Sequence, residues 1–215
     1  MHIADNILKH HLKNVLFVSG TAFGGKTTMS TLLEEKYGFL RYGEGDRERW
    51  LEHRAYANSD DQPAMCCDRR DLESFLNRPA DEYAQWLQAS IAEQTEMQII
   101  DLIKLSQDQR VVADVLLPLE RLKRIADYHQ VILLIAPLEM LDERFFHRED
   151  KRDLYEAILS MPDPQRTMAN MKEVLRKVTL PLETFYESGL KCLVRDEEKS
   201  IEHTFREIEQ HFHLG

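Results

Sequence analysis

The feature that most constrains this chain is the eight-residue segment GTAFGGKT at residues 20–27. The residues before it, 14–19 (NVLFVS), are apolar and β-branched, which predicts a buried strand. The residues after it, 26–37, carry their apolar side chains on one face, which predicts a helix. Glycines let the turn curl so that its amides point inward, and the helix N-terminus adds partial positive charge. A strand, this turn and a helix in that order therefore predict a phosphate-binding loop.

The loop residues have expected parts in binding ATP and Mg²⁺. Lys26 would bring its ammonium group to the β- and γ-phosphates and serve in catalysis, and the Thr27 hydroxyl would coordinate Mg²⁺. The alternative is a glycine-rich turn that carries a lysine by chance, which the strand before it and the helix after it make rarer. The expected nucleotide-binding residues in this segment are Gly20, Thr21, Ala22, Phe23, Gly24, Gly25, Lys26, Thr27 and Thr28.

The rest of the chain alternates between predicted strands and helices. Further strands are predicted at 39–42, 110–117, 130–136 and 190–194. Further helices are predicted at 46–57, 79–104, 119–128, from about 138, from the prolines at 162 and 164 to about 187, and at 200–212. Alternation of this kind implies parallel strands joined by helical crossovers. We therefore expect one domain, 1–215, built as a three-layer α/β/α sandwich around a mostly parallel five-stranded sheet, whose strand order periodicity does not predict.

Composition and charge exclude some classes of binding partner. The net charge of −10 and the pI near 5.4 disfavour binding to long nucleic acid, which requires a basic face. The longest apolar run, 131–137, is too short to cross a bilayer, and the first 14 residues lack the pattern of a signal peptide. Three cysteines without metal-binding spacing are typical of reduced thiols. These features predict a cytoplasmic protein that does not act at a membrane.

Residues 14–37, and the order of elements along the whole chain, resemble the small P-loop kinases: nucleoside monophosphate, shikimate, gluconate and adenylylsulfate kinases. The resemblance implies a P-loop NTPase fold with an acceptor-binding segment at about 44–105 and a lid at about 144–166. It also implies transfer of the γ-phosphate of ATP to a small metabolite, nucleoside or nucleotide. One difference is Phe23, because many of these kinases have glycine at that fourth loop position. The resemblance does not assign a subfamily.

Three acidic residues are expected near the phosphates. Shikimate, gluconate and adenylylsulfate kinases carry an acidic-x-Asp pattern after the second strand. By this resemblance Asp46 would orient the acceptor hydroxyl as a catalytic residue, and Glu44 would lie near the metal. Asp114 ends an apolar strand, where a carboxylate is costly unless something pairs with it, and where this superfamily places the outer ligands of the metal. The simpler alternatives are helix caps at both aspartates.

Arginines after the fourth predicted strand indicate a lid. Arg144, Arg148 and Arg152 recur every four residues and would share one helical face. Their spacing is similar to the L-x-x-R-x-x-x-R entry to the lid of the same kinases, which implies a catalytic Arg148 and a nucleotide-binding Arg144. Lid arginines neutralise charge in the transition state and exclude water. The alternative is an exposed helix face with acidic neighbours.

Two classes of function stay open at this stage, a small-molecule kinase and a regulatory NTPase that acts without an acceptor. The chain has no N-K-x-D, and Asp114 is followed by Val-Leu-Leu rather than by D-x-x-G, which disfavours a GTPase and favours ATP. A polynucleotide 5′-kinase is a third possibility, disfavoured by the acidic charge. The irregular stretch 58–78 contains Arg69, Arg70 and Arg78, which are possible contacts to the acceptor.

Overall fold

The computed structural model describes residues 3–43, 47–137, 140–141, 145–196 and 198–215, with the backbone alone at 47 and 150. Contacts within the chain divide it into two compact units. The first, which we call the sheet unit, comprises Met1–Glu44, Thr95–Pro137 and Pro181–Gly215. The second, the helical unit, comprises Gly45–Gln94 and Leu138–Leu180. The predicted lid and most of the predicted acceptor-binding segment therefore belong to the helical unit, and each unit is described by itself.

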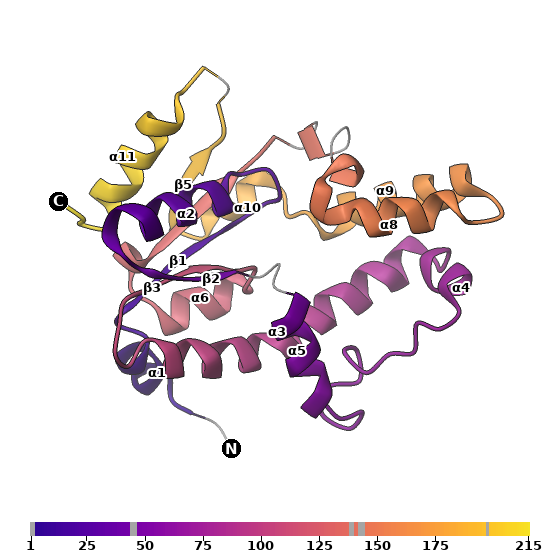
Figure 1. The fold of residues 1–215 in the computed structure, drawn as a ribbon, viewed down its shortest axis with the longest axis horizontal. Helices are drawn as coiled ribbons and strands as arrows, with labels where there is room; N and C mark the ends of the chain where they lie inside the picture. Colours follow the sequence, from indigo (N-terminus) through magenta and orange to yellow (C-terminus); the bar gives the residue numbers. More distant parts are fainter. Residues whose placement is uncertain (1–2, 44–46, 138–139, 142–144, 197) are drawn as a thin grey trace. The chain divides into compact units, whose positions relative to one another are not determined.

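The sheet unit contains a five-stranded sheet in the order β2-β3-β1-β4-β5. Figure 1 shows strands of this sheet with helices packed around them. Every pairing between neighbouring strands of the described residues is parallel, which confirms the predicted α/β class. The first strand lies between β3 and β4, so its carboxyl end is a point where the chain connections diverge to either side. Ligands of open α/β sheets bind at such points. The strands are β1 (Val15–Gly20), β2 (Leu40–Gly43), β3 (Val111–Asp114), β4 (Val131–Ile135) and β5 (Lys191–Val194).

Helices cover both faces of this sheet, as the three-layer prediction requires. The strands β1, β3 and β4 are buried along their whole length, which explains why they are continuous apolar runs rather than alternating ones. One face packs against α2 (Lys26–Tyr37) and α11 (Ile201–His211). The other face packs against α1 (Asp5–His11), the C-terminal part of α5 (Ala80–Leu105), α6 (Leu119–Ile125) and α10 (Leu182–Glu187).

Several helices differ from the sequence prediction. The helix predicted to run to about 187 is two helices, α9 (Pro164–Val178) and α10, because Pro181 has no amide hydrogen to continue the first one. One short helix of the helical unit, α4 (Leu72–Leu76), was not predicted, and α8 (Arg152–Leu159) covers only the last part of the helix predicted from about 138. The start of the helix predicted from about 138 lies outside the described residues.

The helical unit is held by side-chain hydrogen bonds between its segments. Asn170 of α9 donates to the carbonyls of Leu76 and Arg78 at 2.9 Å each. Thr167, one turn earlier, donates to Asn77 at 2.9 Å. These bonds attach the end of α4 to α9.

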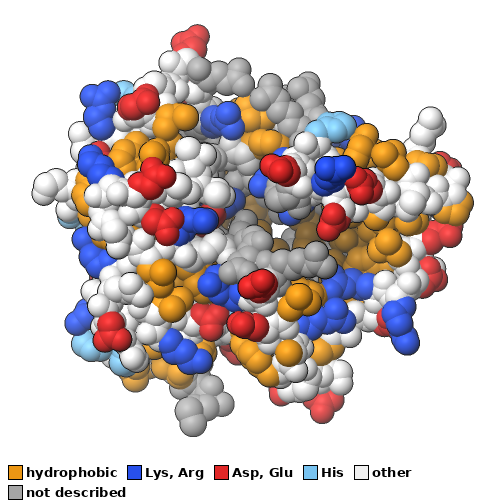
Figure 2. Space-filling view, in the orientation of Figure 1, with side chains coloured by type: hydrophobic (Ala, Val, Ile, Leu, Met, Phe, Trp, Pro, Cys, Tyr) orange, Lys and Arg blue, Asp and Glu red, His pale blue; other side chains and the backbone are white. Residues whose placement is uncertain are grey.

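The surface carries charges of both signs. Lys, Arg, Asp and Glu side chains are interspersed over the face seen in Figure 2. Among the described residues, no helix has both the length and the apolar character that crossing a membrane requires.

Candidate functional site

The predicted phosphate-binding loop leaves the carboxyl end of β1 and enters α2 at Lys26. The amide of Thr21 donates to the carbonyl of Leu134 at 3.0 Å, and the Thr21 hydroxyl accepts from the amide of Ala136 at 2.7 Å. Both partners belong to β4 or the residue that follows it. The beginning of the loop is therefore fixed to the neighbouring strand by one backbone and one side-chain hydrogen bond.

The three loop glycines are required for two different reasons. A Cβ atom would lie 2.0 Å from the Leu134 carbonyl oxygen at Gly20 and 2.1 Å from it at Gly24. No side chain fits against a backbone atom at that distance, so these two glycines let the loop lie directly on β4. Gly25 meets nothing within 4 Å, but its φ of 95° is in the left-handed region. It therefore turns the chain into α2 and leaves open space beside the first turn.

Phe23 also has a left-handed backbone, with φ 61°. A bulky residue rarely adopts this conformation, which costs roughly 1–2 kcal/mol. Glycine, which has no Cβ, would adopt the same backbone conformation without this cost. Arg195, the residue after β5, donates from its guanidinium to the Phe23 carbonyl at 2.9 Å and supports this conformation.

Lys26 is the first residue of α2, and its side chain turns back across the loop. Its ammonium nitrogen lies 3.1 Å from the carbonyl oxygen of Thr21, and the residue is only 9% exposed. A buried ammonium is costly unless it is hydrogen-bonded. The positive charge that the sequence predicts for phosphate binding is therefore held inside the loop, next to the amides of the first helical turn.

Among the described residues, no side chain caps the N-terminus of α2, and its first turn contains no acidic residue. The amides of Lys26, Thr27 and Thr28 occupy the positions that have no partner within a helix. An open helix N-terminus of this kind favours an anion. Together with the buried ammonium of Lys26, it forms a site suited to phosphate oxygens.

Thr27 and Asp114 meet at the edge of this loop. The Thr27 hydroxyl donates to a carboxylate oxygen of Asp114 at 2.8 Å, although 87 residues separate them in sequence. The strand register explains the contact, because Asp114 pairs with Val18 of β1 and with Gly43 of β2 at the carboxyl end of the sheet. Asp114 is 3% exposed, so the structure places this carboxylate in the interior, beside the loop.

A hydroxyl and a carboxylate are oxygen ligands of the kind that a magnesium ion would use. Among the described residues, no group of three or more His, Cys, Asp or Glu side chains could hold a metal ion by itself. Magnesium commonly uses one or two protein ligands and completes its shell with water and substrate phosphates. Thr27 and Asp114 supply such a partial set of oxygen ligands.

The remaining predicted site residues lie either outside the described residues or in the helical unit. Glu44, Asp46 and Arg144 lie outside the described residues. Arg148 belongs to the helical unit, between the 3₁₀ turns η2 (Phe145–His147) and η3 (Glu149–Lys151).

The prediction that Arg148 and Arg152 share one helical face is wrong. Arg148 has an extended backbone, with φ −72° and ψ 145°, and α8 begins only at Arg152. Arg152 is exposed and pairs with Glu156 at 2.8 Å, a partner that the sequence analysis did not name.

Two residues of the loop's surroundings were missed by sequence reasoning. Arg195 donates to the Phe23 carbonyl of the loop, and the carbonyl of Leu134 accepts from the amide of Thr21. Both positions follow from the strand order, in which β4 neighbours β1 and β5 neighbours β4. The only sequence signal for Arg195 is its place directly after an apolar strand.

No protein-family model matches this sequence, and a comparison with curated proteins gave no significant match. The function is therefore inferred from the geometry of the site. The order β2-β3-β1-β4-β5, with a glycine-rich loop after the central strand, is consistent with a P-loop-like topology.

Proposed function

We propose that this protein is an ATP-dependent phosphotransferase that moves the γ-phosphate onto a small-molecule acceptor. The observation that carries the proposal is the cluster of Lys26, Thr27 and Asp114 at the loop after β1. A buried ammonium, an uncapped helix N-terminus and a hydroxyl–carboxylate pair meet there. Phosphoryl transfer depends on positioning and charge neutralisation, and these groups supply both.

Each residue of the site would have a role that follows from its chemistry. The loop amides and Lys26 would hold the phosphate oxygens, and the ammonium would neutralise charge on the β- and γ-phosphates. Thr27 and Asp114 would hold Mg²⁺, which neutralises phosphate charge when it is bound. By the kinase resemblance, Asp46 would orient the acceptor hydroxyl, Glu44 would lie near the metal, and Arg144 and Arg148 would act from a lid.

The first test is equilibrium binding of a non-hydrolysable ATP analogue with Mg²⁺, measured by calorimetry. We expect Lys26→Ala to weaken binding and to lower turnover at least about 100-fold, because a preorganised charge in the loop is lost. Lys36→Ala is the matched control. This lysine lies on the same helix and pairs with Glu209 at 2.6 Å, so nucleotide binding should persist. Unchanged binding in Lys26→Ala would remove the loop from the function.

A second measurement separates transfer from switching. ADP release is followed in the wild-type protein while nucleosides, nucleotides, sugars and sugar acids are added in turn. Release that depends on one acceptor supports the kinase. Release that is equal with and without every acceptor would instead support the regulatory NTPase.

A further inference from the structure

The helical unit contains a second group of cations that the phosphate-binding loop does not involve. Its members are three arginines packed on four aromatic side chains, and they come from α3 (Arg47–Tyr56), the connection after it, α4, and the segment that runs from Arg78 into α5. We call it the arginine–aromatic cluster, and it consists of Arg54, Arg69, Arg78, Trp50, Phe75, Tyr83 and Trp86.

The aromatic residues form a preorganised wall. Phe75, Tyr83 and Trp86 contact one another edge to face, with ring centroids 4.9–5.2 Å apart. Phe75 and Tyr83 are buried, and the indole of Trp86 donates to the Ala64 carbonyl at 2.8 Å. The carboxylate of Glu93 accepts from the amides of Ala64 and Met65, so the same connection is tied to α5 twice. Rings held in this way change little on ligand binding.

The arginines lie on the faces of these rings. The guanidinium carbon of Arg78 is 4.0 Å from the ring centroid of Phe75, and that of Arg69 is 4.8 Å from the ring centroid of Trp50. Arg54 lies 5.5 Å from the same ring of Trp50. All three arginines are half-buried. When an arginine stacks on an aromatic face, its N–H donors point outward in the plane of the guanidinium and can donate to an oxyanion.

Within the part of the chain that the structure describes, no carboxylate forms an ion pair with these arginines, although Asp68 interacts electrostatically with Arg54. Arg78 instead donates to the Phe75 carbonyl at 3.1 Å. Burial lowers the pKa of Arg69, and the positive charge of Arg54 lowers it further. Gathering like charges away from water is unfavourable, and a bound anion would relieve it.

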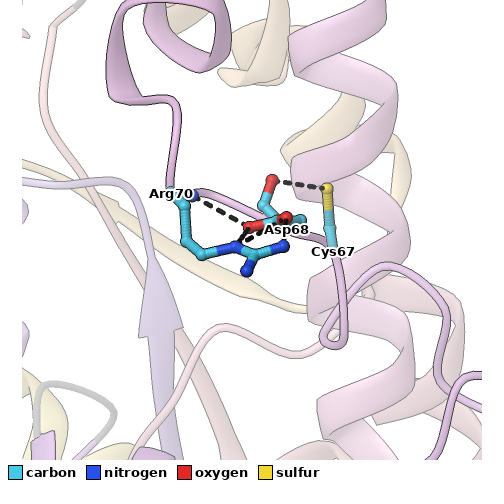
Figure 3. Close-up of polar contacts among 3 residues, drawn as sticks. All are labelled: Cys67, Asp68 and Arg70. Carbon is cyan, nitrogen blue, oxygen red and sulfur yellow. Dashed lines mark hydrogen bonds and ion pairs between the residues drawn. The ribbon is translucent and has the colours of Figure 1, made fainter.

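The neighbouring carboxylate is already engaged. Asp68 accepts from Arg70 at 2.6 Å, and the two side chains close a small loop beside Cys67, as Figure 3 shows. Hydrogen bonds from Arg70 lower the pKa of Asp68 to about 2, so this carboxylate is ionised and held by Arg70. The consecutive arginines 69 and 70 therefore differ, because one is paired with an acid and exposed while the other lies on the aromatic wall.

We propose that the arginine–aromatic cluster binds the phosphate group of a small molecule, with Arg69 as its central ligand. The planar guanidinium can donate two parallel hydrogen bonds to one phosphate, which a lysine cannot do. If the protein is the phosphotransferase proposed above, on which this second step rests, the bound molecule is the acceptor. The acceptor class is then a small phosphorylated compound rather than a neutral sugar or nucleoside.

The two tryptophans of the chain, Trp50 and Trp86, both belong to the cluster, so intrinsic fluorescence reports on it directly. The full-length protein is titrated with inorganic phosphate at constant ionic strength, with sodium chloride as the salt control and acetate as the carboxylate probe. We expect a saturable change with phosphate, none with chloride, and weaker binding of acetate. Arg69→Gln should weaken phosphate binding roughly tenfold or more, because charge-assisted hydrogen bonds are lost. Arg70→Gln is the matched control and should titrate as the wild type does.

The outcomes are separable from those of the first proposal. The titration is repeated in Lys26→Ala, where the phosphate-binding loop is disabled, and the fluorescence change should persist. If the wild-type protein gives the phosphate-dependent signal but does not bind the ATP analogue, the cluster is upheld and the kinase is rejected. Arg54→Gln provides a second variant if Arg69→Gln unfolds, and it should also weaken binding. No saturable change in the wild type, or equal binding in Arg69→Gln and Arg70→Gln, would overturn the proposal and leave the arginines with a packing role.

Discussion

The two cationic sites of this protein are built in opposite ways. The loop after β1 is one contiguous segment, and its shape comes from backbone contacts: glycines against the Leu134 carbonyl and a lysine turned toward the Thr21 carbonyl. The arginine–aromatic cluster is built from side chains of four separate segments that stack on one another. A site made by the backbone tolerates almost no added volume, whereas a site made by side chains depends on particular rings and hydrogen bonds.

The largest loss of stability is expected for a substitution in the phosphate-binding loop. Gly24→Ala would put a methyl group 2.1 Å from the Leu134 carbonyl oxygen, and neither backbone segment can move away easily. We expect the free energy of unfolding to fall by about 3 kcal/mol. Gly25→Ala, which meets no atom within 4 Å, should cost only about 1 kcal/mol for its positive φ. Chemical denaturation of the two variants measures both values, and equal losses would contradict the packing argument.

A smaller effect is expected in the side-chain-built site. Trp86→Phe keeps an aromatic ring but removes the indole donor to the Ala64 carbonyl. The loss of this part-buried bond should lower the free energy of unfolding by about 1 kcal/mol. Trp50→Phe is the control, since no hydrogen bond from the Trp50 indole is found among the described residues. Denaturation followed by circular dichroism compares them, and a Trp50 variant as unstable as the Trp86 variant would show that ring size, not the hydrogen bond, matters.

The last prediction concerns the left-handed backbone of Phe23, where the expected difference is as small as that for Trp86. Phe23→Gly and Phe23→Ala both remove the ring, but only glycine adopts φ 61° without strain. We therefore expect the glycine variant to be more stable than the alanine variant by about 1 kcal/mol, measured as the difference between their unfolding free energies. Equal stabilities would mean that the left-handed backbone at this position costs nothing.

Much of the sheet unit could be predicted because its signals are local. Continuous apolar strands bounded by turns predicted β1, β3 and β4 within a few residues, and the glycine-rich loop identified the junction with α2. The predicted helix face for Arg148 and Arg152 failed, because a spacing of four residues is meaningful only on a continuous helix. The break at Pro181 was also overlooked, although a proline inside a helical pattern normally marks one.

The α/β class, the loop at residues 20–27 and the place of Lys26 and Thr27 at the start of a helix could be predicted from the residues alone, because each depends on contiguous residues and on backbone rules. The strand order could not be predicted in this way, and it is the strand order that brings Asp114 to 2.8 Å from Thr27 and Arg195 to the Phe23 carbonyl. The same holds for the arginines that stack on Trp50 and Phe75. Contacts between distant segments depend on how several elements pack at once, and no local pattern of residues encodes that packing.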